Sequence, residues 1–489
     1  MPRISLCVIV RDEEANLPSC LAAAADLVEE MIVVDTGSTD RSREVAASWG
    51  ARVVDFPWSD SFAAARNEGL RHAAGDWIFW LDADDRIDET NRAKLRRLFP
   101  HLSSEVLAYG MICQSPPDSL LGWTRNVLQF RLFRRHPRLR WRYRIHEQLT
   151  IHELIDEGLG RIQDTDIVIQ HVGYLDPDRL RGKQQRNRRL LELDFAENPE
   201  DPHVLLQVGW SLVDDGRPAD ALPLLQRALA RAHPQDTAII KLYNLVVLAY
   251  TRLGRCAEAL EVAQRGLQRF PDETELLYQQ ALLRMGLGDA AGAEACFRRL
   301  LTRPEPPYVT MGVDPALRGW LARYNLGVLY RDQGRHAEAG EQWRAVVREK
   351  PDYASAWLGL AEVCLTLGRW PELEEVARQL EQLPGQELAA ECFRARGAMA
   401  RREYALARQR LEAAIARWPA ALEPRILYSH ALLQEGRDWQ AAERALRDIL
   451  ALDPTNRQAQ HNWAVLRELL AQQRPPSGVA SDPGSASLG

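Results

Sequence analysis

The first 115 residues alternate short apolar runs with segments in which apolar residues recur at helical spacing. Strands this apolar, each followed by a helix, are typical of a mostly parallel sheet covered by helices on both faces. We therefore predict an α/β domain at the N-terminus. The apolar runs cover residues 4–10, 31–34, 53–54 and 77–81, and the helical segments cover residues 17–28, 39–49 and 61–74.

A second pattern begins near Pro202, where Ala, Leu, Arg and Glu recur at helical spacing with one glycine per unit. Gly254 and Gly288 are 34 residues apart, and Gly334 and Gly368 repeat that interval. The next position at this interval is Arg402, where the period expects glycine. The spacing resembles that of tetratricopeptide repeats, in which each unit is a pair of helices. About seven units fit.

Two segments depart from the repeat. A Pro-rich stretch at 304–315 adds twelve residues to one unit, and we expect it to loop out of the stack. The last sixteen residues, 474–489, contain little that a core could bury and predict a disordered tail. The expected organisation is an α/β domain at 1–180, a helical linker at 181–201 and an all-α solenoid at 202–473.

Composition excludes several classes of protein. The chain is 46% hydrophobic and 27% charged, which indicates buried cores rather than disorder. A net charge of −6 provides no global field for nucleic acid or an anionic membrane. The seven cysteines are never spaced as C-x-x-C, and no run approaches the roughly 18 apolar residues of a membrane span. These features predict a cytoplasmic protein with no nucleic acid partner and no transmembrane segment.

Acidic residues follow every predicted strand, at the edge of a parallel sheet where ligands collect. Asp82, Asp84 and Asp85 come directly after an apolar strand. Carboxylates this close repel one another unless a cation lies among them, and Mg²⁺ or Mn²⁺ prefers such oxygen ligands. The alternative is that Asp84 or Asp85 caps the next helix. The other strand ends carry Arg11, Asp12, Glu13, Glu14, Asp35 and Asp55.

The ordered segments "SLCVIVRDEEANL", "MIVVDTGSTDRS" and "ARNEGLRHAAGDWIFWLDADD" resemble the nucleotide-sugar-binding half of family 2 glycosyltransferases of the GT-A fold. The resemblance covers about residues 1–180. It implies that Asp82 faces the ribose and that Asp84 binds a metal ion between the donor's phosphates. It also implies a contact of Asp35 with the nucleotide base and of Arg66 with the phosphates, and it matches Glu14 to an acidic position after the first strand. We place Arg11 and Asp55 in the same donor site.

Eight arginines and no acidic residue lie between Ser119 and His146, a local positive field that suits a diphosphate. Nucleic acid is the competing ligand. Residues 140–145 alternate with period two, so we expect most of this charge on the solvent face of a strand. The arginines are Arg125, Arg131, Arg134, Arg135, Arg138, Arg140, Arg142 and Arg144.

His146 and Glu147 follow these arginines, where similar glycosyltransferases place an acidic residue at the mouth of the acceptor site. An inverting transfer needs a base for the acceptor's proton, and we assign Glu147 to that role. If the chain stays extended, His146 and Glu147 face opposite ways. The alternative is that Glu147 only forms an ion pair with nearby arginines.

His171 follows another apolar strand and is our second candidate metal ligand, because transferases of this fold often supply a late histidine and imidazole suits Mn²⁺. A buried structural histidine is the alternative. Lys183 and Arg186 are candidates to close over the pyrophosphate, although an exposed helix face explains most of the basic cluster around them.

By this resemblance we expect an inverting, Mn²⁺- or Mg²⁺-dependent transfer of a sugar from a nucleotide diphosphate, with a UDP-sugar as first choice. Tetratricopeptide arrays bind peptides or other copies of the same array. A peptide or protein acceptor and a homo-oligomer are therefore both possible interpretations. The combination resembles bacterial peptide glycosyltransferases that modify bacteriocin precursors. The alternatives are a saccharide or lipid-linked acceptor, and a repeat scaffold with an inactive transferase domain. A nucleotidyltransferase is disfavoured because the first strand lacks a Gly-rich phosphate loop.

Overall fold

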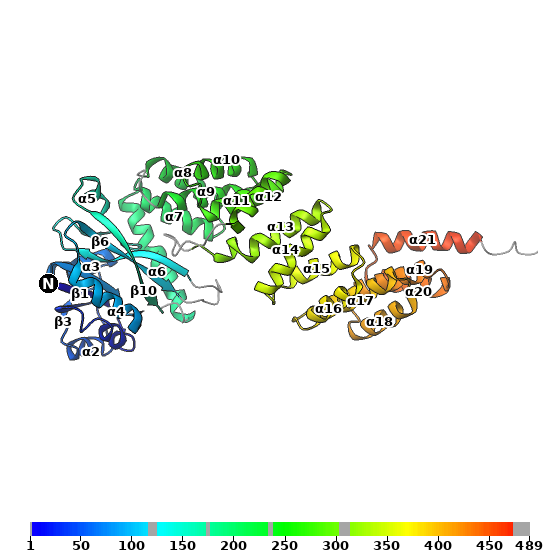
Figure 1. Ribbon diagram of the computed structural model, residues 1–489, viewed down its shortest axis with the longest axis horizontal. Coiled ribbons are helices and arrows are strands. Elements are labelled where there is room, and N and C mark those ends of the chain that lie inside the picture. Colours follow the sequence, from blue (N-terminus) through cyan, green and yellow to red (C-terminus); the bar gives the residue numbers. More distant parts are fainter. Residues whose placement is uncertain (1, 116–124, 173–176, 233–237, 303–312, 473–489) are drawn as a thin grey trace, which may run out of the picture. The chain divides into compact units, whose positions relative to one another are not determined.

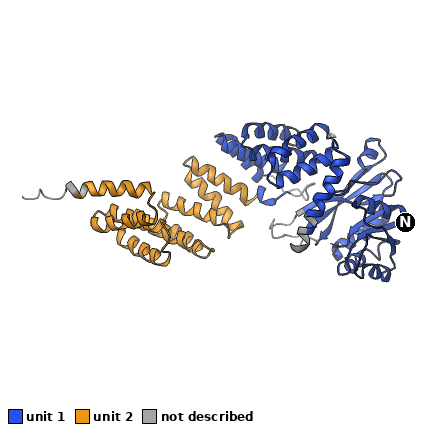
Figure 2. Cartoon of the chain, turned by 180° about the vertical axis from the view of Figure 1, so that it is seen from behind, with its two compact units in different colours: residues 1–318 blue, residues 319–489 orange. Residues whose placement is uncertain are grey.

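The computed structural model describes residues 2–115, 125–172, 177–232, 238–302 and 313–472. The chain forms two compact units, residues 1–318 and 319–489, so the boundary between them lies inside the repeats (Figure 1, Figure 2). The domain boundaries expected near residues 180 and 202 stay predictions. The expected tail and residues 304–312 of the expected loop lie outside the described part of the chain.

Eight strands form one sheet in the order β3-β2-β1-β4-β7-β6-β10-β5. Parallel pairing joins β1 to β2 and β4, β2 to β3, and β6 to β10, while β7 and β5 run antiparallel to their neighbours. The predicted α/β fold with a mostly parallel sheet is confirmed. The strands are β1 (Ile4–Val10), β2 (Glu30–Asp35), β3 (Arg52–Asp55), β4 (Trp77–Asp82), β5 (Asp85–Arg86), β6 (Val106–Ser115), β7 (Arg125–Arg134) and β10 (Arg161–His171).

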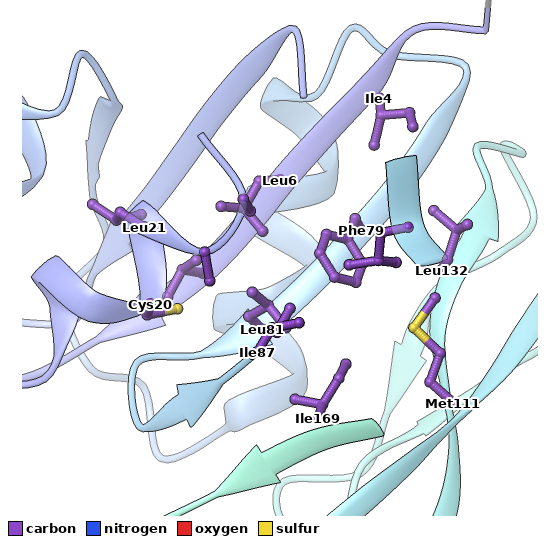
Figure 3. Close-up of a cluster of buried hydrophobic side chains, with 14 of the residues drawn as sticks. Ile4, Leu6, Cys20, Leu21, Phe79, Leu81, Ile87, Met111, Leu132 and Ile169 are labelled. Carbon is purple, nitrogen blue, oxygen red and sulfur yellow. The ribbon is translucent and has the colours of Figure 1, made fainter. Parts of the chain in front are cut away.

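The central strands are buried on both faces, which is why they read as continuous apolar runs. In β4, Trp77, Phe79 and Leu81 enter one core, whereas Ile78 and Trp80 enter the other. Figure 3 shows the first core, where side chains of β1, β4, β6, β7 and β10 meet Cys20 and Leu21. Its helices are α1 (Leu17–Ala22), α2 (Ser42–Ser48) and α4 (Glu89–Leu98), followed by η1 (Phe99–His101); the second core is covered by α3 (Phe62–His72), α5 (His152–Asp156) and the short pair β8 (Trp141–Arg142) and β9 (Gln148–Leu149).

Helix α6 (Pro177–Glu197) leads into the repeats, which form seven helix pairs and a last helix within the described residues. None of the described helices has the length and apolar character needed to cross a membrane. The helices are α7 (Pro202–Asp214), α8 (Pro218–Arg231), α9 (Ala238–Arg252), α10 (Cys256–Arg269), α11 (Thr274–Gly286), α12 (Ala290–Thr302), η2 (Pro315–Arg318), α13 (Trp320–Asp332), α14 (His336–Glu349), α15 (Ala354–Thr366), α16 (Trp370–Glu381), α17 (Glu387–Ala400), α18 (Tyr404–Arg417), α19 (Glu423–Glu435), α20 (Trp439–Leu452) and α21 (Arg457–Gln472).

Small residues let the helices of neighbouring units approach closely around Trp343, which is only 1% exposed. A Cβ on Gly327 of α13 would lie 2.5 Å from the indole nitrogen, and one on Gly359 of α15 would lie 2.7 Å from the ring carbons. The indole therefore fills the space that two glycines leave open, which explains the Gly-rich pattern of these units.

The turn after the first helix of each unit requires a left-handed residue. Gly334 has φ of 73° and Gly368 has φ of 66°, and Arg402 adopts φ of 63° at the equivalent position. A residue with a Cβ is strained there by about 1 kcal/mol or more. The 34-residue period thus locates a strained arginine.

We expect Arg402→Gly to stabilise the unit 319–489 by about 0.5–1 kcal/mol, because glycine relieves the left-handed strain, although its freedom in the unfolded chain offsets part of the gain. Urea unfolding followed by circular dichroism measures the change. Gly334→Ala is the matched control and should cost about 1 kcal/mol, since a Cβ there meets no atom within 4 Å and only the backbone is strained. Equal effects of the two substitutions would contradict the strain argument.

Candidate functional site

The carboxyl ends of β2 and β3 place two predicted site residues beside each other. Asp35 and Asp55 are register partners, and Asp35 is buried while Asp55 is exposed. Arg43 of α2 reaches both, with Nη1 3.3 Å from Asp35 Oδ2 and Nη2 2.7 Å from Asp55 Oδ2. The hydrogen bonds of Arg43 lower the pKa of Asp55. Arg43 was not predicted from the sequence, although it lies in the first turn of α2.

The acidic residues after β1 brace the turn that leads into α2. Asp12 Oδ1 accepts the amide of Thr39 at 2.7 Å, which lowers the pKa of Asp12, and Glu14 Oε2 accepts the amide of Arg41 at 3.0 Å. Glu14, which we predicted to lie in the nucleotide-sugar site, therefore also has a hydrogen-bond partner in the protein, the amide of Arg41. Arg11 is exposed at the end of β1.

Arg11 and Arg186 of α6 lie close enough for their charges to interact. Partial burial lowers the pKa of Arg186, whose guanidinium lies 5.0 Å from the Phe62 ring, and the positive charge of Arg11 lowers it further. Two positive charges that repel each other favour an anion beside them. Lys183 lies in α6, but its side chain is outside the described part of the structure.

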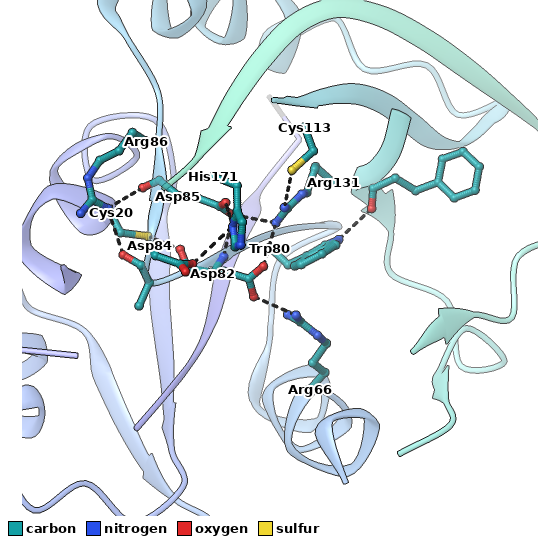
Figure 4. A network of polar contacts seen from close by, with 12 residues as sticks. Cys20, Arg66, Trp80, Asp82, Asp84, Asp85, Arg86, Cys113, Arg131 and His171 are labelled. Carbon is teal, nitrogen blue, oxygen red and sulfur yellow. Dashed lines mark hydrogen bonds and ion pairs between the residues drawn. The ribbon is translucent and has the colours of Figure 1, made fainter. Parts of the chain in front are cut away.

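Asp82, Asp84, Asp85 and His171 form a cluster at the ends of β4 and β10 (Figure 4). One oxygen of each carboxylate and one ring nitrogen of His171 all lie within 4.8 Å of one another. The pairing of β5 with β10 sets His171 opposite Asp85. The sheet thus brings together the predicted ligands Asp84 and His171, which are 87 residues apart in the chain.

Asp85 is fully buried and has three donors for its two oxygens. Oδ2 accepts the amide of Asp82 at 2.8 Å and Nη1 of Arg131 at 2.7 Å, and Oδ1 lies 3.0 Å from Nδ1 of His171. A carboxylate with this many partners fixes its neighbours' positions. Nδ1 of His171 also lies 3.4 Å from Oδ1 of Asp84, so this face of the ring is directed at the carboxylates.

Arg66 of α3 bridges two of the predicted functional carboxylates. Its Nη2 lies 2.8 Å from Asp82 Oδ1, and its Nε lies 2.6 Å from Glu147 Oε1. The guanidinium carbon is 4.1 Å from the ring centroid of Trp80 and 5.3 Å from that of Trp141, so two indoles fix the arginine through cation–π contacts. The structure thus gives Glu147 an ion pair, with Arg66 rather than with the arginines that precede it in the sequence.

Arg131 lies within the acidic cluster, although the sequence alone gave it no role apart from the other arginines of its segment. It is 1% exposed, its guanidinium carbon lies 3.9 Å from the Trp80 centroid, and it pairs with Asp85 and, at 3.7 Å, with Asp82. The available signal was its place on an apolar strand between Phe130 and Leu132. Burial alone would raise the pKa of Asp82, but Arg66 and Arg131 outweigh it and hold that pKa well below its usual range.

The remaining arginines of the predicted basic segment mostly have structural roles. Arg138 forms a bidentate ion pair with Glu157, at 2.6 and 2.7 Å.

The expected strand over residues 140–145 is wrong, because regular pairing ends at Arg142 and the following residues form bends. Strand parity therefore does not apply to His146 and Glu147. The side chain of Arg125 lies outside the described residues.

Comparison with known proteins follows the two halves of the chain. Residues 5–156 match the family described as "Glycosyl transferase family 2", and residues 206–274, 245–309, 278–343 and 324–387 match the family described as "Tetratricopeptide repeat". A TPR repeat-containing protein of Synechococcus elongatus is 31% identical over 363 residues, which cover 72% of this chain and 76% of that protein.

Residues 5–156 are a glycosyl transferase family 2 domain, and tetratricopeptide repeats follow on its C-terminal side. The transferase is also similar to the SPbeta prophage-derived glycosyltransferase SunS of Bacillus subtilis, at 25% identity over 47% of this chain and 53% of SunS. The lipopolysaccharide core biosynthesis glycosyltransferase LpsC of Rhizobium meliloti is 30% identical over 32% of the chain and 58% of LpsC. The chain thus spans little more than half of either glycosyltransferase.

Among solved structures, the chain is similar to a tetratricopeptide repeat protein from Parabacteroides merdae. The alignment covers 54% of this chain and 98% of that protein, with 17% identity and a TM-score of 0.38.

The family match places Asp35, Arg66, Asp82, Asp84 and Glu147 inside the glycosyltransferase region, and His171 fifteen residues beyond its end. The predictions of a glycosyltransferase, and of its fusion to repeats, are confirmed.

Proposed function

We propose that this glycosyltransferase moves a sugar from a nucleotide diphosphate to its acceptor by an inverting, metal-dependent displacement, with a UDP-sugar as the first candidate donor. The observation that carries the proposal is the Asp82, Asp84 and His171 cluster, which Arg66 joins to Glu147. A donor's phosphates and an acceptor's nucleophile can be held a few ångströms apart by these groups.

The residues present fit a divalent cation. Three carboxylates, those of Asp82, Asp84 and Asp85, lie together against two guanidinium groups, those of Arg66 and Arg131, so negative charge remains for a cation. Carboxylate oxygens with one imidazole nitrogen suit Mn²⁺ or Mg²⁺. We assign Asp84 and His171 as the ligands, with Asp82 toward the ribose. A bound ion supplies positive charge against the diphosphate.

The donor site extends along the carboxyl edge of the sheet. Asp35 and Asp55 at the ends of β2 and β3 are our candidates for the base and ribose side, together with Glu14. Arg11, Arg66 and Lys183 are our candidates for the phosphate side. The repulsion between the charges of Arg11 and Arg186 supports an anion on that side.

Glu147 is our candidate for the base. In the displacement, the acceptor's nucleophile loses its proton to Glu147 and bonds to the anomeric carbon, while the bond from that carbon to the diphosphate oxygen breaks with its electron pair. Arg66 holds the carboxylate at a fixed distance from Asp82. Charge that develops on the leaving diphosphate is stabilised by the preorganised cationic groups of the donor site.

We infer a peptide or protein acceptor that binds with help from the repeats, because stacked helix pairs present a long surface for extended chains. The partial likeness to SunS is compatible with this inference, and the likeness to LpsC keeps a saccharide acceptor as the second candidate. All seven cysteines are free, which fits a reducing compartment such as the cytoplasm.

Thermal shift with nucleoside diphosphates tests the donor site. We expect one of UDP, GDP, CDP and dTDP, at about 100 times its dissociation constant with Mn²⁺, to raise the melting temperature by about 4 °C, because binding to the folded state adds about 2.7 kcal/mol. Asp84→Asn should remove most of the Mn²⁺-dependent part, since it replaces a charged ligand by a neutral one.

The control is Asp166→Asn, which neutralises a carboxylate that is 82% exposed and pairs with Lys94. It should leave the nucleotide shift unchanged. No stabilisation by any of the four nucleotides with Mn²⁺ would favour the inactive scaffold, and release of pyrophosphate from a donor would favour a nucleotidyltransferase. An unchanged shift in Asp84→Asn would exclude Asp84 as a ligand.

A further inference from the structure

The segment Tyr143–Glu147, which we name the Glu147 loop, joins β8 to β9 and has an unusual backbone. Tyr143 and His146 have φ of 72° and 53°, in the left-handed region that favours glycine. Each such residue costs on the order of 1–3 kcal/mol and persists only where surrounding contacts enforce it. Contacts from outside the loop must therefore hold it in this conformation.

The first set of contacts comes from α6. Asp194 is 3% exposed, and its carboxylate oxygens accept the amide of Arg144 at 2.9 and 3.1 Å. The carbonyl oxygen of Arg144 accepts the amide of Phe62, at the start of α3, at 2.9 Å. Ile145 of the loop packs with Leu190 and Leu191 of α6 in one buried cluster. The backbone of the loop is thus fixed from both sides.

The second set comes from α7, the first helix of the repeats. The hydroxyl of Tyr143 donates to the carboxylate of Asp201, the N-cap of α7, at 3.0 Å. Nε2 of His203 lies 3.0 Å from the carbonyl oxygen of His146. The rings of Tyr143 and His203 stack with centroids 4.3 Å apart. Both left-handed residues of the loop therefore contact the first repeat directly.

We propose that α6 and α7 act as part of the catalytic apparatus, with Asp194 and His203 as positioning residues that hold the Glu147 loop. The proposal rests on the role of Glu147 as base. It explains why a transferase domain carries repeats that begin directly beside its site: the first repeat completes the site. Misplacement of a catalytic group by about 1 Å can cost up to a hundredfold in rate, so loss of these contacts should be visible in kcat.

The competing explanation is that these contacts only join two parts of the fold. The chain offers a matched control, because Arg188 of α6 and Asp215, directly after α7, form an exposed ion pair at 2.6 Å that joins the same helices without contacting the loop. A purely structural role predicts that loss of either set of contacts lowers stability and leaves kcat unchanged. A positioning role predicts that only those to the loop affect turnover.

The experiment uses the full chain with Mn²⁺ and measures release of nucleoside diphosphate from UDP-glucose, UDP-N-acetylglucosamine and GDP-mannose, with water as acceptor. With the donor that is turned over fastest, Asp194→Ala should lower kcat about tenfold or more and change the donor KM less than about twofold. Asp194→Asn keeps an acceptor oxygen and should recover most of the rate. Asp215→Asn should behave as the wild type.

The decisive measurement combines variants. If Asp194 acts through Glu147, Asp194→Ala should cause no further loss of kcat in a Glu147→Gln background, whereas independent structural damage would multiply the losses. Should Asp194→Ala not fold, His203→Phe keeps the stacked ring, loses the bond to His146 and serves as the second variant. Hydrogen exchange should increase in the peptides that contain the loop and not in those of α4, whose described residues do not contact it.

The outcomes separate this proposal from the proposed function. If Glu147→Gln retains full kcat, or no donor is turned over, the role of Glu147 fails and this proposal fails with it. If Glu147→Gln abolishes turnover while Asp194→Ala and His203→Phe leave kcat unchanged, only the positioning role is overturned. Multiplicative losses in the double variant, or an equal loss in Asp215→Asn, would also overturn it.

Discussion

Glu147→Gln is expected to lower kcat for donor turnover by about 10²–10³-fold, because an amide cannot accept the proton that the nucleophile loses. Glutamine keeps the size of the side chain and an oxygen that can accept the hydrogen bond from Arg66 Nε. The donor KM should change less than about threefold, because the role we propose for Glu147 is toward the nucleophile and not toward the nucleotide. Initial rates of nucleoside diphosphate release give both constants.

The control for this substitution must also remove a charged, paired carboxylate. Glu68, on the same helix as Arg66, meets that condition: its side chain is 17% exposed, against 14% for Glu147, and it pairs with Arg71 at 2.9 Å. Glu68→Gln should leave kcat within about twofold of the wild type. A similar small effect in Glu147→Gln would show that Glu147 serves only as the ion-pair partner of Arg66.

The strands and the acidic residues at their ends could be predicted from the sequence, because both depend on residues that are adjacent in the chain. Burial on both faces makes β1 and β4 continuous apolar runs, and the first polar residues after them mark the carboxyl edge of the sheet. Asp82 and Asp84 could be placed at that edge without knowing which strands pair. The 34-residue period likewise located the turn at Arg402 before its backbone was known.

The partners across the site could not be predicted, because they depend on long-range pairing. His171 meets Asp85 only because β10 pairs with β5. Arg131 looked like one more arginine of a basic segment, and only the position of β7 between β4 and β6 makes it a buried partner of Asp85. This strand order cannot be predicted from the spacing of residues along the sequence.

The Glu147 loop shows a local pattern overruled by tertiary contacts. The alternation of basic and apolar residues over 140–145 favoured a strand. The backbone of Tyr143 instead adopts the left-handed conformation, and its ring stacks on that of His203. Asp194 lies 50 residues after Arg144, within a helix whose sequence looked like an exposed basic face. Tertiary contacts of this kind are the usual reason that propensity fails at functional sites.

Arg131→Met is expected to destabilise the unit 1–318 by about 3–5 kcal/mol, because removal of one partner leaves buried charge uncompensated on Asp85 and weakens the compensation of Asp82. In a unit of 318 residues the melting temperature should fall by about 4–8 °C. Methionine keeps most of the volume and the contact with Trp80, so a cavity does not explain the loss. Arg135→Met removes an exposed charge four residues further on and should change the melting temperature by less than about 2 °C.

Because a bound cation would offset the excess negative charge, Mn²⁺ should restore more stability to Arg131→Met than it adds to the wild type. Differential scanning calorimetry with and without Mn²⁺ measures both effects, and a small loss that Mn²⁺ does not reverse would show that the cluster carries less negative charge than the carboxylates of Asp82, Asp84 and Asp85 imply.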